Sequence, residues 1–241
     1  MKRAVITQPT FLPWLGWFDL MDQSDYFIVL DDVGFSKQSW VQRNRIRTSR
    51  GLEYLTVPTR TTGRLGQHIN QTIIETQPAR LSRKITRSVR QNYVKAQFFD
   101  QYFESFYDAF LTAAASGNLI DLNCGLISWI IEALGLEQQL IFSSNIPAIG
   151  QRGHYVANLC KAVGVNRYLS PAGAKDYLIK DYDAFETHNI SIEMHVYEHP
   201  VYRQCFDPFM PYASVLDLLM NEGSDAMDIL RSGRCQNETL F

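Results

Sequence analysis

The fold is decided by the stretch AVITQPTFLPWLGWFDLM, which spans residues 4–21. Its first three residues form an apolar run typical of a buried strand, and residues 18–21 indicate the start of a helix. In the loop between them, two prolines fix the backbone and Gly16 lets a ligand or another segment approach closely. A strand that passes through such a loop into a helix often builds a binding site. We therefore take three loop residues as candidate binding residues: Gln8, Trp14 and Gly16. The alternative is that the aromatic side chains of this loop belong only to the core.

A second apolar run, at residues 26–30, ends at Asp31 and Asp32. Continuous apolar runs suit strands that are covered on both faces, as in parallel sheets. Because one helix-length connection separates the two runs, we predict that they lie side by side and parallel. The aspartates should then meet the opening loop at one edge of the sheet. Asp31 is a candidate general base and Asp32 a candidate binding residue. Adjacent strand residues point to opposite faces, so one of the two is expected to face the site.

The rest of the chain predicts an α/β protein. Short apolar or alternating segments predict strands at residues 52–58, 139–142, 166–170 and 191–196. A helical insertion is expected at about residues 78–135, where apolar residues recur at helical spacing. The predicted fold is a mostly parallel sheet built from both ends of the chain, and residues 1–241 form a single domain.

The first helix of this insertion carries positive charge without any acidic residue. Its apolar stripe consists of Leu81, Ile85, Val89 and Tyr93. Its cations are Arg80, Arg83, Lys84, Arg87 and Arg90. Such a face is either simply solvated or able to attract an acidic partner or a phosphorylated ligand.

Composition excludes several classes of function. The chain has 241 residues, is 46% hydrophobic, and carries a formal net charge of -2. This charge balance gives no reason to expect general nucleic-acid binding. The four cysteines show no CxxC spacing, so we expect reduced thiols and no metal site. No apolar run is long enough for a signal peptide or a membrane span, so we expect a soluble cytoplasmic protein without membrane contact.

Two further segments offer polar side chains for a site. Residues 35–47 are rich in hydrogen-bond donors and supply the candidates Gln38, Trp40, Arg43 and Asn44. Residues 170–175, SPAGAK, lie between a predicted strand and a helix-like segment. Backbone N–H groups there could hold an anion, and Lys175 would add charge. Ser170 and Lys175 are therefore candidates, although the segment lacks the residue order of a P-loop and an ordinary connection is the alternative.

His199 is the most attractive histidine. It lies in the segment YEHPVYRQ, residues 197–204, among polar side chains. A histidine in such surroundings is a candidate general base near neutral pH. The alternative is a structural histidine before a proline. Tyr202 and Gln204 in the same segment are candidate binding residues, whereas His154 and His195 are weaker candidates.

Taken together, these motifs resemble the WbqC-like protein family. The matching residues are Gln8-Pro9-x-Phe11-x-Pro13-Trp14-x-Gly16, Asp31-Asp32, Trp40 with Arg43-Asn44, Tyr168-Leu169-Ser170, Tyr177-Leu178, Tyr202-x-Gln204, and SxLDLLxNxG at residues 214–223. A looser analogy concerns residues 14–17, WLGW, which stand where nucleotidylyltransferase-like α/β proteins carry a His-x-Gly-His turn. Because the histidines are absent, the analogy supports only the fold, namely a nucleotidyltransferase-like sheet.

The resemblance implies a function. Family members tend to be encoded with surface-polysaccharide or specialised-metabolite genes, and a glycine (aminoacyl) transferase acting on an amino sugar is implied. We therefore predict transfer of an aminoacyl or acyl group from an activated donor to the amine of a nucleotide-linked sugar; the sequence identifies no cofactor. The alternatives are a non-catalytic sugar- or carrier-binding protein and a nucleotide-using ligase.

Roles in this predicted reaction follow from side-chain chemistry. Asp31 or His199 would accept the amine proton. Amide groups would position the sugar or the acyl carbonyl: Gln8, Gln38 and Asn44. Arg43 and Lys175 would contact phosphate.

Overall fold

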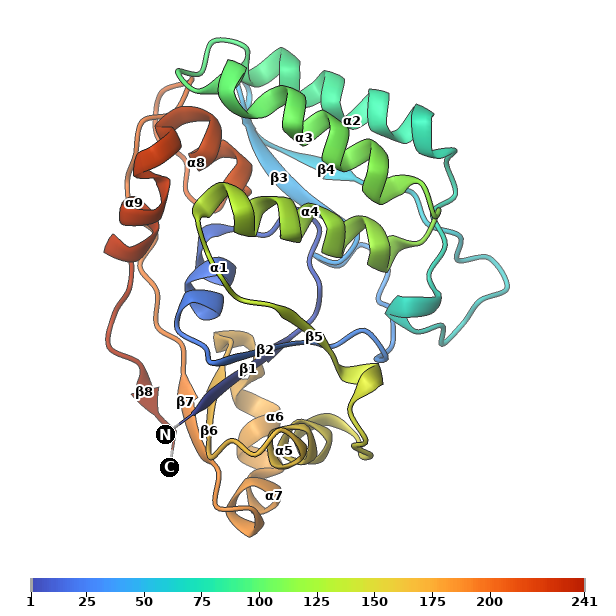
Figure 1. Ribbon diagram of the computed structural model, residues 1–241, viewed down its shortest axis with the longest axis vertical. Helices are drawn as coiled ribbons and strands as arrows, with labels where there is room; N and C mark the ends of the chain where they lie inside the picture. Colours follow the sequence, from blue (N-terminus) through green and yellow to red (C-terminus); the bar gives the residue numbers. More distant parts are fainter. Residues whose placement is uncertain (1, 241) are drawn as a thin grey trace.

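The computed structural model describes residues 2–240, and its centre is a six-stranded sheet (Figure 1). The strands are, from edge to edge, β5 (Leu140–Phe142), β2 (Tyr26–Val29), β1 (Arg3–Thr7), β6 (Arg167–Ser170), β7 (Ser191–Met194) and β8 (Glu238–Thr239). Neighbouring strands are parallel except for β7 and β8. This is the order of doubly wound α/β proteins, in which ligands bind at the carboxyl edge where the order reverses. Here that point lies between β1 and β6.

The predicted parallel pairing of the first two strands is confirmed. Ile6 pairs with Ile28, and α1 (Leu15–Asp22) connects the two strands. Successive side chains of β1 enter different hydrophobic clusters, with Val5 in one and Ala4 in the other. The run is continuously apolar because both faces of the strand are covered.

Helices cover the two faces of the sheet (Figure 1). Below it lie α5 (Arg152–Ala162), α6 (Lys175–Lys180) and α7 (Tyr182–Thr187), and above it lie α1 and α4 (Leu119–Leu134). The α/β class and the mostly parallel sheet are therefore as predicted. A closer kinship to nucleotidyltransferases stays a prediction.

Three helices make up the insertion: α2 (Pro78–Tyr93), α3 (Phe99–Ala114) and α4. The predicted apolar stripe of α2 is buried, since its four members are at most 2% exposed. The five cations of α2 are exposed. The hydrophobic stripe therefore decides how α2 packs, and the charges stay in solvent.

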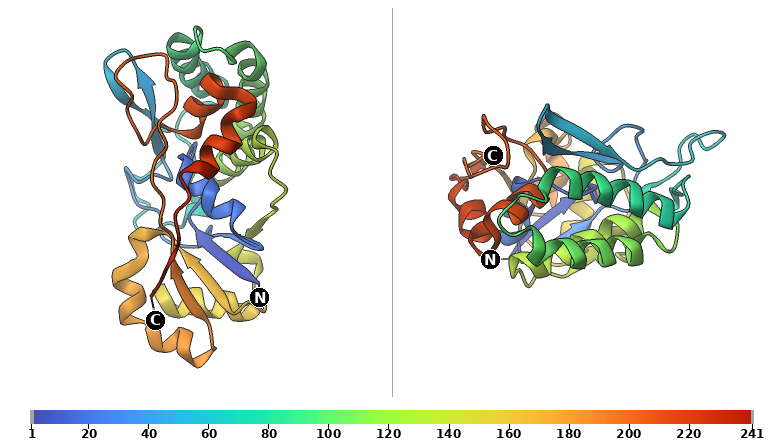
Figure 2. Two further views of the ribbon diagram at one scale, coloured as in Figure 1. Left: turned by 90° about the vertical axis from the view of Figure 1, so that its left-hand side faces the viewer. Right: turned by 90° about the horizontal axis from the view of Figure 1, so that it is seen from above.

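A two-stranded antiparallel ribbon stands apart from the central sheet. It consists of β3 (Arg43–Thr48) and β4 (Gly51–Thr56), so the strand predicted at residues 52–58 lies outside the main sheet. Figure 2 shows the ribbon beside the loop that precedes α8 (Val215–Glu222). In that contact Ser214 N donates to Arg45 O at 2.8 Å.

The chain after α8 contains further regular structure. It contains α9 (Ala226–Ser232) and β8. Short 3-10 helices occur at η1 (Ile69–Gln71), η2 (Ser143–Asn145), η3 (Ala172–Ala174) and η4 (Gly223–Asp225). Among residues 2–240, no helix combines the length and the apolar character needed to cross a bilayer.

Candidate functional site

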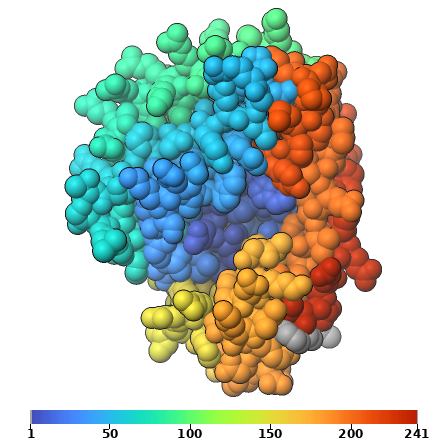
Figure 3. All heavy atoms as spheres, turned by 180° about the vertical axis from the view of Figure 1, so that it is seen from behind, coloured from blue at the N-terminus to red at the C-terminus, as the bar shows by residue number. Residues whose placement is uncertain are grey.

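A cavity of about 240 Å³ lies where the opening loop, the start of β3 and the loop before α8 meet. The space-filling view shows a hollow on this face, with N-terminal residues at its floor (Figure 3). That floor is surrounded by the blue segment that contains β3 and β4, the orange segment before α8 and the amber segment near residues 165–180. The site thus combines segments that are distant in sequence. We call the 240 Å³ cavity the aromatic pocket.

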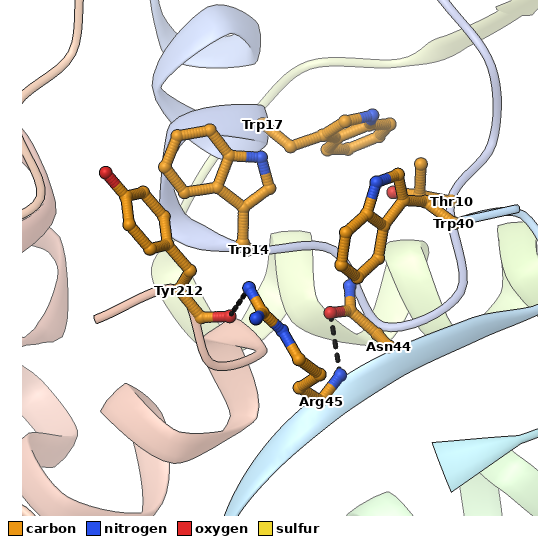
Figure 4. Close-up of a pocket in the computed structure, with 7 residues that line it drawn as sticks. All are labelled: Thr10, Trp14, Trp17, Trp40, Asn44, Arg45 and Tyr212. Atoms are coloured by element: carbon orange, nitrogen blue, oxygen red, sulfur yellow. Dashed lines mark hydrogen bonds between the residues drawn. The ribbon is translucent and has the colours of Figure 1, made fainter. Parts of the chain in front are cut away.

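Aromatic side chains dominate its lining (Figure 4). The lining residues are Thr10, Trp14, Trp17, Trp40, Asn44, Arg45 and Tyr212. Trp14 and Trp40 stand on either side of the pocket, with the Arg45 side chain rising between them. Planar aromatic walls with a cation suit a ligand that has a ring and a negative charge.

The opening loop is held in an unusual conformation by β3. Leu12 has a positive φ of 44°, and Asn44 Nδ2 donates to its carbonyl at 2.8 Å. Asn44 Oδ1 accepts from Arg45 N at 2.8 Å. Asn44 therefore lines the pocket as predicted, but both of its polar groups are engaged in shaping the loop.

Gly16 is required by the position of Trp14. A Cβ atom at residue 16 would lie 2.4 Å from the Trp14 ring. The indole thus rests directly on the first turn of α1, and only glycine leaves room for it. The sequence-based argument expected a ligand or another segment to approach Gly16, whereas the group that approaches it is a side chain of the loop itself. Ligand binding at Gly16 stays a prediction.

Arg45 brings unsatisfied hydrogen-bonding capacity to the pocket. Its Nη2 donates to Tyr212 O at 3.3 Å, and its guanidinium lies 5.3 Å from the centre of the Trp40 ring. Its Nε is buried without a partner among residues 2–240, as is the Oγ1 of Thr10. Buried polar atoms normally have hydrogen-bond partners, so a ligand or water in the pocket would supply the missing hydrogen bonds.

The profile of the WbqC-like protein family matches residues 8–229. The chain belongs to the WbqC-like protein family. It is also 33% identical over 232 residues to Rv1507c, an uncharacterized protein of Mycobacterium tuberculosis (strain ATCC 25618 / H37Rv), and the match covers 96% of this chain and 98% of that protein. No solved structure matches the chain. The matched range contains every segment that lines the aromatic pocket.

In this WbqC-like chain, His199 lies against the pocket wall without lining the pocket. Its ring is nearly parallel to that of Trp14, 6.3 Å away, and 5.3 Å from that of Tyr212. Its Nδ1 is 2.9 Å from Pro200 O, so Nδ1 carries the proton because a carbonyl only accepts. Its Nε2 is buried with no partner among residues 2–240. Burial lowers the pKa of His199, which keeps the ring neutral and its Nε2 lone pair free near pH 7.

Asp31, the other predicted base, lies elsewhere. Its carboxylate accepts from Ser143 Oγ at 3.0 Å, Ser144 N at 3.0 Å, Ser144 Oγ at 2.7 Å and Asn70 Nδ2 at 3.2 Å. Burial raises the pKa of Asp31, but these hydrogen bonds outweigh it and the net pKa is lowered. A carboxylate so stabilised is a weak base. Asp31 and the opening loop leave the same edge of the sheet, as expected, but Asp31 does not line the aromatic pocket.

Asp32 is also engaged within the WbqC-like fold. It accepts from Tyr155 OH at 2.6 Å, and its Oδ1 lies 2.6 Å from Ser143 Oγ, whose single hydroxyl proton is shared between Asp31 and Asp32. Burial and the bond to Asp32 raise the pKa of Tyr155 to about 12. The aspartate pair therefore links the ends of β2 and β5 to α5, and binding of substrate by Asp32 stays a prediction.

Tyr202 and Gln204 point into a buried polar network. Tyr202 OH and Gln204 Nε2 donate to Asp217 Oδ2 at 2.7 and 2.8 Å. Burial raises the pKa of Asp217, against the lowering effect of these donors. The Tyr202 ring packs 6.0 Å from His199. The structure thus places these two residues behind His199, where they hold the loop before α8 on that helix.

The remaining candidates border the hollow or lie outside the pocket. The Arg43 guanidinium covers the Tyr54 ring at 4.3 Å. Gln38 and Lys175 are exposed, and Ser170 is fully buried at the carboxyl end of β6. The Gln8 side-chain amide forms no hydrogen bond within residues 2–240, and its backbone carbonyl accepts from Trp17 Nε1 at 3.4 Å. Ligand contacts by these five residues stay predictions.

Of the weaker candidates, His195 is part of a buried polar cluster. Its Nε2 lies 2.7 Å from Asp19 Oδ2, and Asp19 also accepts from Arg234 Nε at 2.8 Å. The group joins α1 to β7 and to the chain after α9. His154 is exposed on α5. Across the described residues, no three His, Cys, Asp or Glu side chains gather as a metal site would require, and all four cysteines are free.

Sequence reasoning missed Arg45 and Tyr212, and it did not select Thr10 and Trp17 from the opening loop. Alternation along β3 could have suggested that Arg43 and Arg45 share a face. It could not show that Arg45 faces the pocket while Arg43 stacks on Tyr54. Nothing in the sequence places Tyr212 beside Arg45, which lies 167 residues away.

Proposed function

We propose that the protein binds a nucleotide-linked amino sugar in the aromatic pocket and transfers an aminoacyl or acyl group to the sugar amine. The observation that carries this proposal is the Arg45 guanidinium, with its unpartnered Nε, between Trp14 and Trp40. Stacking on an indole suits a base or a sugar ring. A guanidinium suits the neighbouring phosphate.

The transfer step needs a base for the amine proton. The amine nitrogen attacks the acyl carbon of the activated donor and forms the new C–N bond, the donor's leaving group departs with its electron pair, and the amine loses one proton. Of the two predicted bases, His199 is favoured because its Nε2 lone pair is free, whereas four hydrogen-bond donors surround the Asp31 carboxylate. His199 lies behind Trp14 and Tyr212, so the reaction requires an opening between these rings.

A binding protein without catalysis is the second candidate. It is favoured by the fact that His199 does not itself line the pocket. Such a protein would present the sugar to a partner, and its pocket residues would have the same ligand contacts. A nucleotide-using ligase stays the third alternative and would show a requirement for a nucleoside triphosphate.

The proposal is tested with uridine diphosphate glucosamine as the probe. Three of the four tryptophans line the pocket, so the probe should change intrinsic fluorescence saturably. Arg45→Gln removes the cation, and we expect affinity to fall roughly 10-fold or more, since hydrogen bonds to charged groups contribute about 1.5–3 kcal/mol. Trp129→Phe, outside the pocket, is the control and should bind normally.

Catalysis is then assayed by adding glycine thioesters and searching for a product with the added mass of a glycyl group. Binding together with such a product supports the transferase. Binding without product from any activated donor supports the binding protein. Equal affinities of the Arg45→Gln variant and the wild type would refute the assignment of the pocket.

A further inference from the structure

A second cavity adjoins the short segment that carries Trp40. It measures about 480 Å³, and Lys37 and Gln42 line it, whereas Trp40 lines the aromatic pocket. The other residues that line this second cavity are Pro58, Thr59, Arg60, Thr61, Thr62, Arg64 and Glu75. We call this space the threonine cavity, because the hydroxyl residues Thr59, Thr61 and Thr62 line it.

Cations in this cavity lack partners. Lys37, Arg60 and Arg64 all line it, and none forms an ion pair with a carboxylate between residues 2 and 240. Glu75 is the one acidic residue in the lining, so the cavity keeps an excess of positive charge. A pocket with this charge favours anions.

Thr59 provides an independent sign of a missing ligand. The residue is only 7% exposed, and its Oγ1 is buried without a partner among the described residues. Gln42, in contrast, is satisfied, because it donates to Val57 O and accepts from Gln38 N, each at 2.9 Å. A buried hydroxyl without a partner is uncommon, and a phosphate oxygen could accept from it.

The backbone of residues 61–63 also offers hydrogen-bond donors to a ligand. The N–H groups of Thr61, Thr62 and Gly63 donate to no acceptor within residues 2–240. Gly63 and Gly66 adopt positive φ angles of 70° and 78°, a conformation that glycine takes without strain. The base of the loop is tied down, since Arg60 N donates to Ile73 O at 2.9 Å.

We propose that the threonine cavity binds the phosphate group of a ligand. Lys37, Arg60 and Arg64 would neutralise its charge, and Thr59 Oγ1 would donate one hydrogen bond. The threonine cavity is separate from the aromatic pocket, so phosphate binding there does not depend on the proposed transfer reaction. Two sources share the chemistry: the diphosphate of a nucleotide-linked sugar that spans both cavities, and a phosphorylated second substrate that occupies only this one.

The test is calorimetric titration with inorganic pyrophosphate at low ionic strength. We expect saturable binding that weakens at least 5-fold in Arg60→Gln and in Arg64→Gln, and about 2- to 5-fold in Thr59→Val. Each variant's melting temperature is measured first, and if Thr59→Val is unstable the two exposed arginine variants decide alone. The control is Arg80→Gln/Lys84→Gln on the basic face of α2, which removes more charge from an exposed helix surface and should bind pyrophosphate normally.

Absence of pyrophosphate binding would overturn the proposal. An equal loss of pyrophosphate affinity in the α2 control would also overturn it, because the anion would then respond only to the overall positive charge of the surface. The source is identified by Arg60→Gln with two further probes. Weaker binding of uridine diphosphate glucosamine supports a ligand that spans both cavities. Weaker binding of adenosine diphosphate alone, with the sugar nucleotide unaffected, supports a second substrate. Because Arg45→Gln tests the aromatic pocket separately, failure here leaves the proposed function unaffected.

Discussion

At the scale of a single residue, His199 combines a free lone pair with a lowered pKa. Its folded pKa lies below its unfolded value near 6.5, so the unfolded chain binds more protons in that range and stability rises with pH. The contribution of neutral His199 to the free energy of unfolding is fully present above about pH 6.5, and it is lost as the pH falls through the pKa of the folded state. We predict that chemical denaturation at pH 7.5 and pH 5.5 will show a smaller loss of stability in His199→Gln than in the wild type.

The exposed His154 supplies the control, because His154→Gln should leave this pH dependence unchanged. If His199 is also the base, replacing it by glutamine should lower turnover by roughly 10²- to 10⁴-fold. Wild-type turnover should then decrease when the pH drops below the pKa of His199 in the folded protein. Near-normal turnover in His199→Gln would mean that the histidine only supports Trp14 and Tyr212.

At the scale of an element, the first turn of α1 serves as the surface on which Trp14 rests. Gly16→Ala gains helix propensity but places a Cβ atom 2.4 Å from the indole. We predict that Trp14 leaves its position, that stability falls by about 1–3 kcal/mol, and that affinity for the sugar nucleotide drops. Gly34→Ala, whose Cβ would meet no atom within 4 Å, is the control. Unchanged affinity in Gly16→Ala would show that the pocket does not need Trp14 where the structure places it.

At the scale of the whole molecule, the network around Asp31 connects the central sheet to two segments that flank the helical insertion in sequence. Through Asn70 and the two serines it ties the end of β2 to η1 and η2. Asp31→Asn replaces one acceptor oxygen with a donor, and we expect a loss of roughly 1.5–3 kcal/mol at pH 7, measured by urea denaturation. Because the folded pKa is lowered, the difference should narrow as pH falls through that pKa.

The exposed Asp108 on α3 is the comparison, and Asp108→Asn should change stability little. Asp31→Asn should also retain turnover in proportion to the folded fraction. A variant of normal stability that has lost turnover would reverse the assignment and make Asp31 the base.

The apolar runs of β1 and β2 and the stripe of α2 could be read from the sequence because each is a local periodicity that burial imposes. The lining of the aromatic pocket could be read only in part. Trp14, Trp40 and Asn44 were candidate binding residues and do line it, whereas the fact that Arg45 faces the pocket and Arg43 does not depends on how the β3–β4 ribbon is turned.

The sequence by itself determined the family, the α/β class, the parallel pairing of the first strands and the helical character of residues 78–134. Only the tertiary structure decided that Arg45 and Tyr212 meet, that Asp31 is surrounded by donors, and that His199 lies against Trp14. The physical reason is that strands and helices follow from the spacing of apolar residues along the chain. The partner of a polar side chain, in contrast, depends on which distant segment packing brings beside it.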